Sequence, residues 1–244
     1  MALNFSLDSL LEQSLLTEDP WWVYILNGAW WTIGLTIAAF ALALLIGIIV
    51  GTLRTAPNKF VRGLCEAWIE LFRNIPLIVQ IFIWYFVVPE LVPWYKDWLI
   101  EVDPAVGQFV TAFICMGLFT SSRIAEQVRA GISSLPRGLP NAAKALGFTT
   151  VQAYVQVVLP MAMRLIVPPL TSESMNLVKN TAVAMTIGLP ELTMRANEMG
   201  ENTFPFFAAY LWATILYIII ALVVNQLMAW VEKKSVIPGF IAAK

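Results

Sequence analysis

The 244-residue chain is 59% hydrophobic and 13% charged, with a mean hydropathy of +0.75. This composition lies far outside the range of soluble globular domains and predicts one compact membrane domain. The sequence has no histidine, which excludes histidine-based catalysis and histidine metal ligation. Two cysteines, Cys65 and Cys115, belong to no paired motif, and we interpret them as packing residues rather than a disulfide or metal site.

Hydrophobic segments that could cross a membrane occur five times, since a crossing needs about 20 mostly apolar residues. In chain order they cover roughly residues 25–53, 77–94, 105–122, part of 160–189, and 206–230. The fourth is the least hydrophobic, because Pro168, Pro169, Glu173 and Lys179 lie in it. The predicted fold class is therefore an all-α integral membrane protein with five transmembrane helices.

Basic residues are segregated along the chain. The connections after the first and third spans and the C-terminal tail contain most of them: Arg54, Lys59, Arg62, Arg73, Arg129, Arg137, Lys144, Lys233, Lys234 and Lys244. The other connections hold only Lys96 and Arg195, among many acidic residues. By the positive-inside rule, the N-terminus lies outside and the C-terminus in the cytoplasm. The first span has no basic n-region and is too long for a signal peptide, so we expect it to remain as a membrane helix.

An amphipathic helix is predicted between the first two spans, in FVRGLCEAWIELFRN (60–74). Phe60, Leu64, Ala67 and Leu71 recur at helical spacing, with charged residues between them. Such a helix can lie at the membrane interface. We favour packing of the apolar stripe against neighbouring helices of the membrane domain.

The connection between the third and fourth spans contains a patterned segment, EQVRAGISSLPRGLPNAAKALGFTTVQAYVQVVLP (126–160). Asn141 can cap a helix N-terminus, the residues up to Leu146 form little more than one turn, and Gly147 suits a left-handed stop. The small side chains of Ala142 and Ala143 leave a narrow helix face that the groove of another protein could accept. An ordinary loop between helices is the alternative.

A second helix is predicted to follow directly. Thr149 and Gln152 have the spacing of a capping box. We expect this helix to be closed by Pro160.

Three segments together resemble the HisMQ-type permeases of polar amino-acid ABC importers, and most of all the permeases of glutamate/aspartate importers. They are ELFRNIPLIVQIFIWYFVVPEL, the 126–160 segment, which is similar to the EAA loop of these permeases, and TSESMNLVKNTAVAMTIGL. The resemblance covers about 28–233. It assigns an ATPase-coupling loop to Asn141, Ala142, Ala143, Gly147, Leu159 and Pro160. One departure is Asn141, where the motif usually has glutamate, which puts in doubt a salt bridge to the ATPase at that point.

The resemblance implies the type I (MetI-like) ABC importer fold with five core spans. The domains would be an external segment 1–24, a transmembrane domain 25–231 with a cytoplasmic coupling loop at about 129–160, and a cytoplasmic tail 232–244. It also implies a multi-pass protein of the bacterial inner (plasma) membrane. The resemblance also implies that the chain itself has no catalytic residues, no metal and no cofactor. It lacks a phosphate-binding glycine loop followed by Lys-Ser/Thr, so ATP would be hydrolysed on a partner subunit.

The implied partners are a second permease subunit, two ATPase subunits that bind ATP and Mg, and a periplasmic or extracellular substrate-binding protein. Membrane lipid surrounds the complex, and no nucleic acid is involved. An uneven charge on the fourth span, described next, favours a paralogue over an identical copy as the second permease.

A polar stripe lies on the fourth span. At about 100° per residue, its members fall on an arc roughly 120° wide: Ser172, Glu173, Asn176, Lys179 and Asn180. Ionisable residues within a span usually face a cavity or a partner, so the stripe predicts a substrate pathway. Alternatively, Glu173 and Lys179 neutralise neighbours and hold the two permease halves together.

Arg123 is the candidate for substrate specificity. It lies in GLFTSSRIAEQVRAG, where the resembled permeases commonly have Ala-Tyr-x-Ala-Glu, so arginine replaces tyrosine and Glu126 matches the glutamate. A guanidinium can bind a carboxylate through two parallel hydrogen bonds, which suits a glutamate or aspartate substrate. The alternatives are an i,i+3 pair with Glu126 and snorkelling to the interface.

The sequence therefore predicts the permease subunit of an ATP-driven amino-acid importer, for glutamate and aspartate, which forms the pathway and couples it to a separate ATPase. Two other classes remain: a secondary amino-acid transporter and a structural membrane subunit. A secondary transporter usually has more spans with inverted repeats, and the sequence shows no such repeat. A structural subunit would not need an ordered helix-Gly-helix element in the cytoplasm.

Overall fold

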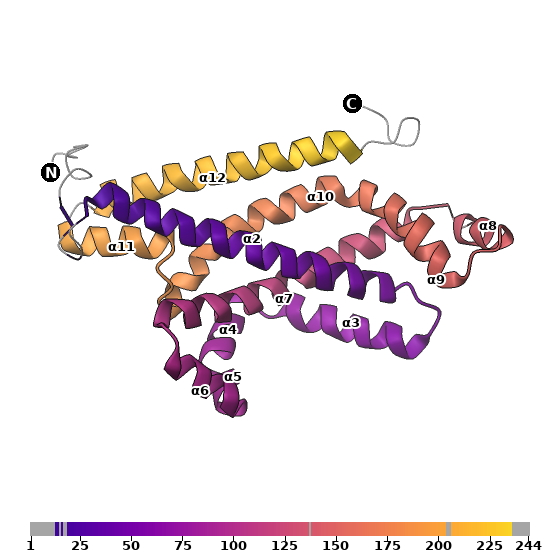
Figure 1. The fold of residues 1–244 in the computed structure, drawn as a ribbon, viewed down its shortest axis with the longest axis horizontal. Coiled ribbons are helices and arrows are strands. Elements are labelled where there is room, and N and C mark those ends of the chain that lie inside the picture. The colour runs from indigo at the N-terminus through magenta and orange to yellow at the C-terminus, as the bar shows by residue number, and fades with distance from the viewer. Residues whose placement is uncertain (1–12, 15, 17–18, 137, 204–205, 236–244) are drawn as a thin grey trace. The chain divides into compact units, whose positions relative to one another are not determined.

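The computed structural model describes residues 13–14, 16, 19–136, 138–203 and 206–235. Most of the predicted external segment, Arg137 and the end of the predicted tail lie outside the described residues. The described elements are helical, apart from an isolated bridge between Gln13 and Pro20. In chain order (Figure 1) they are α2 (Trp21–Leu53), α3 (Lys59–Asn74), α4 (Leu77–Phe82), the π-helix η1 (Ile83–Val87), α5 (Val88–Leu91), α6 (Pro93–Glu101), α7 (Pro104–Ser133), α8 (Leu139–Ala145), α9 (Thr150–Ala153), the π-helix η2 (Tyr154–Val158), α10 (Leu159–Asn180), the 3-10 helix η3 (Thr181–Ile187), α11 (Leu192–Thr203) and α12 (Phe206–Ser235).

Within the described residues, four helical runs are long and apolar enough to cross a membrane: Trp21–Leu53, Pro104–Ser133, Thr150–Ile187 and Phe206–Ser235. They confirm the predicted first, third, fourth and fifth spans. A fifth crossing exists only if Lys59–Asn74 and Leu77–Leu91, which meet at 99°, form one broken span.

The predicted second span, roughly residues 77–94, begins at Leu77 as predicted but is shorter than predicted. Its helix ends at Leu91, contains a π-turn, and at 1.5 Å per residue is about 22 Å long, short of a hydrocarbon core of about 30 Å. The bend before it comes from Pro76, which disfavours helical geometry in the preceding residue. Ile75 is accordingly extended, with φ −92° and ψ 129°.

The chain divides into two compact units. Unit 1 comprises Met1–Ala39, Pro76–Met116 and Asn176–Val223, and unit 2 comprises Phe40–Ile75, Gly117–Met175 and Val224–Lys244. The long helices α2, α7, α10 and α12 each contribute to both units.

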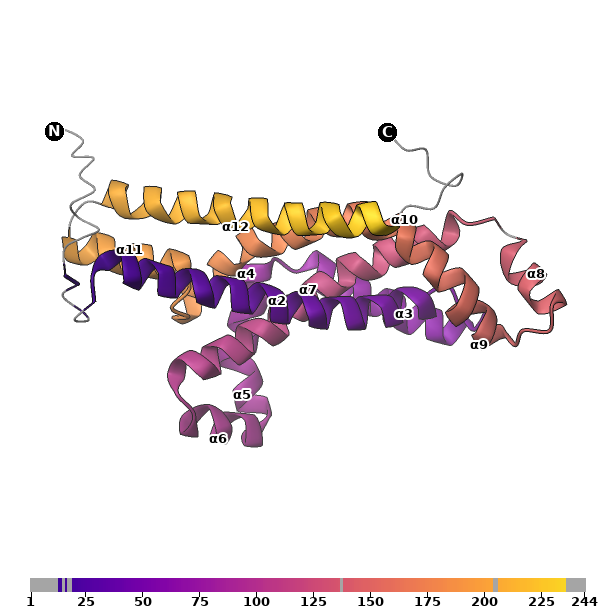
Figure 2. The same cartoon turned by 45° about the horizontal axis from the view of Figure 1, so that its top comes forward.

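In unit 1, α11 lies beside the first turns of α2 (Figures 1 and 2). The approach is close because a Cβ on Gly28 would lie 2.7 Å from the Cγ of Arg195. The Tyr24 hydroxyl donates to Glu198 over 2.6 Å, and the Arg195 guanidinium carbon lies 4.1 Å from the centre of the Tyr24 ring. These contacts fix the side of α11 that faces α2.

The start of α11 is held by Glu191, whose side chain is completely buried. One carboxylate oxygen accepts from the backbone N–H of Met194 (2.9 Å) and the other from the Tyr217 hydroxyl (2.6 Å). Burial raises the pKa of Glu191, and these hydrogen bonds act in the opposite direction.

In unit 2, a core forms where α2, α7 and α10 meet, around Ala43, Ile124, Val128, Ile166 and Leu170. Glycines let the first two helices touch: a Cβ on Gly51 would lie only 2.5 Å from the carbonyl oxygen of Ala125. Helix α7, which this packing holds in place, contributes to both candidate sites described below.

Helix α3 begins at its predicted place, where the Asn58 side chain accepts from the backbone N–H of Phe60 (2.9 Å). The prediction that its apolar stripe packs on neighbouring helices is wrong for the helices of this chain. Phe60 is 73% exposed, and Leu64, Ala67 and Leu71 are exposed too. The buried side is that of Cys65 and Ile69. Nearby on α3, Glu66 pairs with Arg54, and Trp68 donates to the Ser121 hydroxyl over 3.4 Å.

The predicted orientation can be tested with single cysteines in a chain whose two native cysteines are replaced by alanine. Asp97 and Glu201 are exposed, and cysteines in their places should react with a membrane-impermeant thiol reagent added outside intact cells. Cysteines at Lys59 and Lys144, also exposed, should react only after the cells are opened. The opposite labelling pattern would reverse the orientation.

Candidate coupling element and translocation pathway

The residues from Leu139 to Val158, called the coupling element here, contain α8, α9 and η2. Helix α8 starts earlier than predicted: Gly138 occupies the cap position and Asn141 lies inside the first turn. The prediction that Asn141 caps the helix is therefore wrong. Pro140 explains the earlier start, since proline in a first turn sacrifices no hydrogen bond.

The predicted stop at Gly147 is confirmed. Its φ is +91°, the left-handed conformation that glycine adopts most easily. The backbone N–H of Phe148 donates to the carbonyl of Ala143 (3.2 Å) and that of Gly147 to Lys144 (2.9 Å). This is a Schellman-type end, which satisfies carbonyls that would otherwise lack donors.

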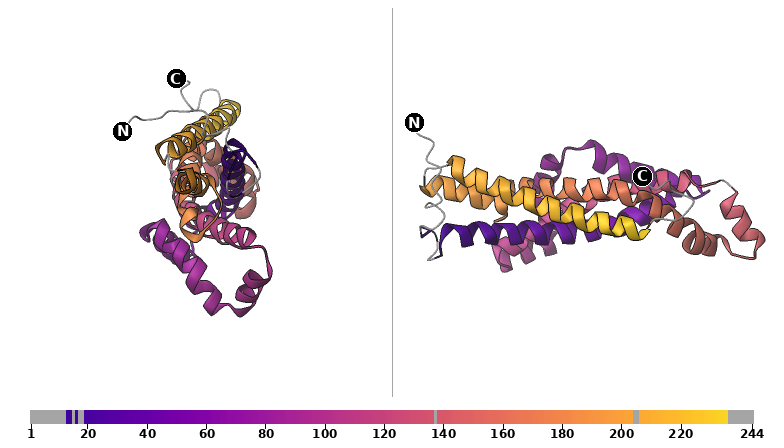
Figure 3. Two further views of the ribbon diagram at one scale, coloured as in Figure 1. Left: turned by 90° about the vertical axis from the view of Figure 1, so that its left-hand side faces the viewer. Right: turned by 90° about the horizontal axis from the view of Figure 1, so that it is seen from above.

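The predicted capping box is also present. The Thr149 hydroxyl accepts from the backbone N–H of Gln152 (3.2 Å), and the Gln152 side chain accepts from that of Thr149 (2.8 Å). The prediction that Pro160 closes the second helix is wrong, because Pro160 is the second residue of α10. The π-helix η2 precedes it and widens the backbone where the proline ring would disturb an α-helix. The right-hand view of Figure 3 shows the coral ribbon reversing direction after α8 and then continuing into α10.

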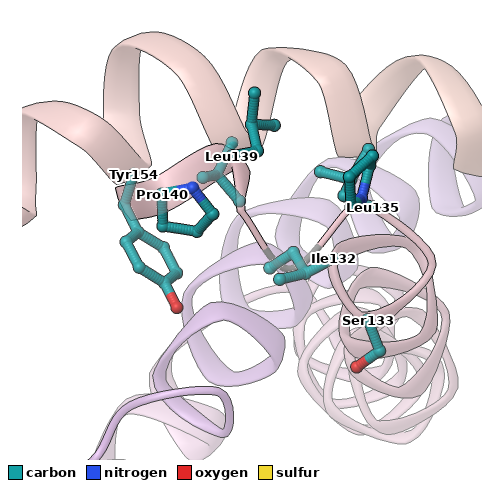
Figure 4. A pocket seen from close by; sticks show the side chains of 8 residues that line it. Ile132, Ser133, Leu135, Leu139, Pro140 and Tyr154 are labelled. Atoms are coloured by element: carbon teal, nitrogen blue, oxygen red, sulfur yellow. The ribbon is translucent and has the colours of Figure 1, made fainter. Parts of the chain in front are cut away.

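The coupling element rests on the end of α7. Leu135, Val158 and Ala162 form a small core there, with Leu139 and Tyr154 packed against it. A cavity of about 340 Å³ lies at this junction, and Figure 4 shows Leu139, Pro140 and Tyr154 on one side of it and Ile132, Ser133 and Leu135 on the other.

The side chains of α8 divide between this support and the surface. Ala143 is buried, whereas Asn141, Ala142 and Leu146 are exposed, Leu146 to 81%. Only Ala142 of the two predicted small residues therefore remains on a face open to another protein. Leu159 is half-buried and Pro160 exposed.

Arg123 and Glu173, both predicted for the pathway, form an ion pair. The Arg123 Nε donates to Oε2 of Glu173 over 2.8 Å and Nη2 donates to Oε1 over 3.3 Å. The alternative pairing of Arg123 with Glu126 is wrong, since Glu126 pairs with Arg54 and Arg129 instead. The Arg123 side chain is 43% exposed and that of Glu173 is 10% exposed, so the pair leaves part of the guanidinium accessible.

Gln127 joins this pair and was missed by the sequence analysis. Its Nε2 donates to Oε1 of Glu173 over 3.3 Å, while its own buried Oε1 has no hydrogen-bond partner among the described residues. Its position four residues after Arg123, on the same helix face, is the signal that could have identified it.

The other members of the predicted stripe lie at the surface of the chain or near it. Ser172 and Lys179 are exposed and Asn176 and Asn180 are half-buried, whereas Leu170, Leu177 and Val178, off the predicted arc, are buried. The chain's own core therefore covers the apolar side of α10 and leaves much of the polar side to a cavity or a partner.

Comparison with known proteins identifies the family. Residues 43–236 match the model of the binding-protein-dependent transport system inner membrane component. The chain belongs to this family. It is 43% identical to the glutamate/aspartate import permease protein GltJ of Escherichia coli K12, over 249 aligned residues that cover all of both proteins.

Further relatives and solved structures agree with this assignment. The chain is 28% identical to the probable glutamine ABC transporter permease protein GlnM of Bacillus subtilis, over 86% of this chain and 92% of GlnM. A solved amino acid ABC transporter with histidines matches with a TM-score of 0.73 at 24% identity, over 88% of this chain and 95% of the other. The inward-facing MetNI methionine ABC transporter matches with a TM-score of 0.71 at 21% identity, over 91% and 100%. The predicted MetI-like fold and the predicted family are confirmed.

The left-handed stop of the coupling element can be tested without steric side effects, because a Cβ at Gly147 or at Gly138 would meet nothing within 4 Å. Gly138 has a φ of −75° and serves as the matched control. Gly147→Val should lower substrate-stimulated ATP hydrolysis by the assembled complex, since a left-handed conformation costs a branched residue more than about 1 kcal/mol.

Gly147→Asn should retain more stimulation, because asparagine tolerates this conformation, and Gly138→Val should change it little. Equal stimulation in all three variants and the parent would contradict a role for the helix stop in coupling.

Proposed function

We propose that the chain is the membrane-spanning permease subunit of an ATP-driven importer for glutamate and aspartate. The observation that carries this proposal is the 43% identity to GltJ over the full length of both proteins. The ordered helix–glycine–helix coupling element supports it, because a permease needs a rigid element through which an ATPase can act.

The second permease subunit is proposed to be a paralogue. In E. coli O6:H1 (strain CFT073), two relatives carry the glutamate/aspartate import name, GltJ and GltK. The chain is 43% identical to the first and 27% identical to the second, so it corresponds to one member of such a pair. Two ATPase subunits that bind ATP and Mg, and an external substrate-binding protein, would complete the complex.

The coupling element is proposed to face the cytoplasm, where it would dock on an ATPase subunit. The excess of basic residues in the same connection supports this side. The exposed residues Asn141, Ala142 and Leu146 are the candidate contacts. Asn141 brings no charge to this surface, so the contact there would rest on hydrogen bonding and packing.

The pathway is proposed to pass the Arg123–Glu173 pair and the polar residues Asn176, Lys179 and Asn180. Arg123 uses Nε and Nη2 for Glu173, which leaves Nη1 and a second Nη2 hydrogen for an incoming carboxylate. Glu173 fixes the orientation of the guanidinium in the absence of substrate. Charged donors held in place in this way bind a carboxylate with little reorganisation.

Uptake of labelled glutamate by cells that produce all four proteins of the complex (both permeases, the ATPase and the binding protein) tests the function. Uptake should be inhibited by excess aspartate more than by glutamine, and it should stop when the ATPase subunit is inactivated. Uptake that persists without ATP hydrolysis would indicate a secondary transporter. An absence of any amino-acid uptake, with the complex assembled, would indicate a structural subunit.

The role of Arg123 can be separated from simple neutralisation of Glu173 with a double variant. With the glutamate-loaded binding protein at a saturating concentration, Arg123→Gln should slow glutamate uptake by about tenfold, since a charge-assisted contact contributes about 1.5–3 kcal/mol. The single variant also leaves the buried Glu173 without its cation. The double variant Arg123→Gln, Glu173→Gln has no unpaired carboxylate at this place, and its glutamate uptake should remain slow. Recovery of the parent rate in the double variant would show that Arg123 acts only on Glu173.

A further inference from the structure

Four charged residues form a cluster in unit 2, called the charge cluster here: Arg54, Glu66, Glu126 and Arg129. Arg54 donates from Nη2 to Glu66 over 3.0 Å and from Nη1 to Glu126. Arg129 donates from Nε to the other oxygen of Glu126 over 3.0 Å. Because Arg54 follows α2, Glu66 lies on α3 and Glu126 on α7, Arg54 ties three elements together.

The Arg54–Glu126 pair at the centre of this cluster is more enclosed than Glu66 and Arg129, whose side chains are 49% and 37% exposed. The Arg54 side chain is 16% exposed and that of Glu126 is 28% exposed. Burial alone would lower the pKa of Arg54, but Glu66 and Glu126 outweigh it and raise that pKa above its usual value. Just before Arg54, Gly51 packs directly on the backbone of α7 at Ala125. The tie between α2 and α7 is thus both electrostatic and steric.

The turn after α2, residues 54–58, also borders the coupling element. An apolar groove of about 280 Å³ lies here. Its lining includes Thr52 and Leu53 at the end of α2, Ala56 and Pro57 of the turn, Val151, Tyr154 and Val155 of the coupling element, and Leu159 of α10. The hydroxyls of Thr55 and Tyr154 lie 3.5 Å apart. The coupling element therefore has two supports, this turn and the end of α7, and Arg54 connects the turn to α7 at Glu126.

We propose that Arg54 is a positioning residue for energy coupling, whose bond to Glu126 makes the two supports of the coupling element move as one body. A displacement of α8 and α9 is then passed to α7, which carries Arg123, instead of being absorbed by bending of the turn. Networks of packed side chains and ion pairs transmit displacement between distant sites in this way. The inference rests on the proposed function, in that it takes the coupling element to be moved by an ATPase.

The matched variants are Arg54→Gln and Arg129→Gln, measured in the complete complex in liposomes. Each variant removes one of the two arginines that pair with Glu126. Arg129 bonds Glu126 within α7, whereas Arg54 bonds it from the turn after α2. In both variants Glu126 keeps one arginine, so neither leaves this carboxylate without a cation. Arg54→Gln should raise the ATP hydrolysed per glutamate transported by a factor of about three, whereas Arg129→Gln should stay close to the parent.

Thermal unfolding of the complex serves as the second measurement, because a merely structural role would lower the unfolding temperature and leave the ATP-to-glutamate ratio unchanged. Equal ratios for the two variants would overturn the inference.

If Arg54→Gln does not assemble, Arg54→Lys replaces it: lysine keeps the charge but lacks the fork that reaches both carboxylates. Its ratio should lie above that of the parent, and an unchanged ratio would overturn the inference. Failure of the parent complex to transport glutamate or aspartate would instead count against the proposed function.

Discussion

Charged side chains in apolar helices need partners, and this constraint organises unit 2. An ionised group removed from water is costly unless it is paired and hydrogen-bonded. Glu173 meets the requirement through Arg123 and Gln127, and Glu126 through Arg54 and Arg129. Apart from Arg129, which bonds Glu126 within α7, the partners come from different elements, so satisfying the charges also helps to fix which faces of α3, α7 and α10 and the turn after α2 meet.

Local structure was predictable where the cause lies within a few residues. The stop at Gly147 and the capping box at Thr149 follow from backbone conformation and side-chain reach alone, and both are present. The cap at Asn141 failed because Pro140 offered a competing start. Pro160 was misplaced because a π-helix accommodates it, and no local sequence signal predicts a π-turn.

Partners far apart in the sequence were beyond local rules. The i,i+3 spacing made Glu126 the natural neighbour of Arg123, yet packing brings Glu173, fifty residues later, into reach. Similarly, helical periodicity showed that α3 has two faces, but not that the side of Cys65 and Ile69 would be the buried one, because that depends on the other helices. Segment types and the family were thus predictable, whereas the pairing within the pathway and the charge cluster required the fold.

The charge balance of the proposed pathway connects its geometry to an acidic substrate. Arg123 and Lys179 carry positive charge and Glu173 carries negative charge, so the pathway residues sum to one positive charge. With tyrosine in place of Arg123, as in the resembled permeases, the same residues would sum to zero. Because Glu173 holds Arg123 by two of its nitrogens, the added charge is fixed in place rather than free to reach the membrane surface. A positive charge held in place attracts a carboxylate, and the attraction is stronger wherever water is partly excluded. In the proposed pathway, arginine in place of tyrosine would favour acidic substrates through both its bonding geometry and its contribution to net charge.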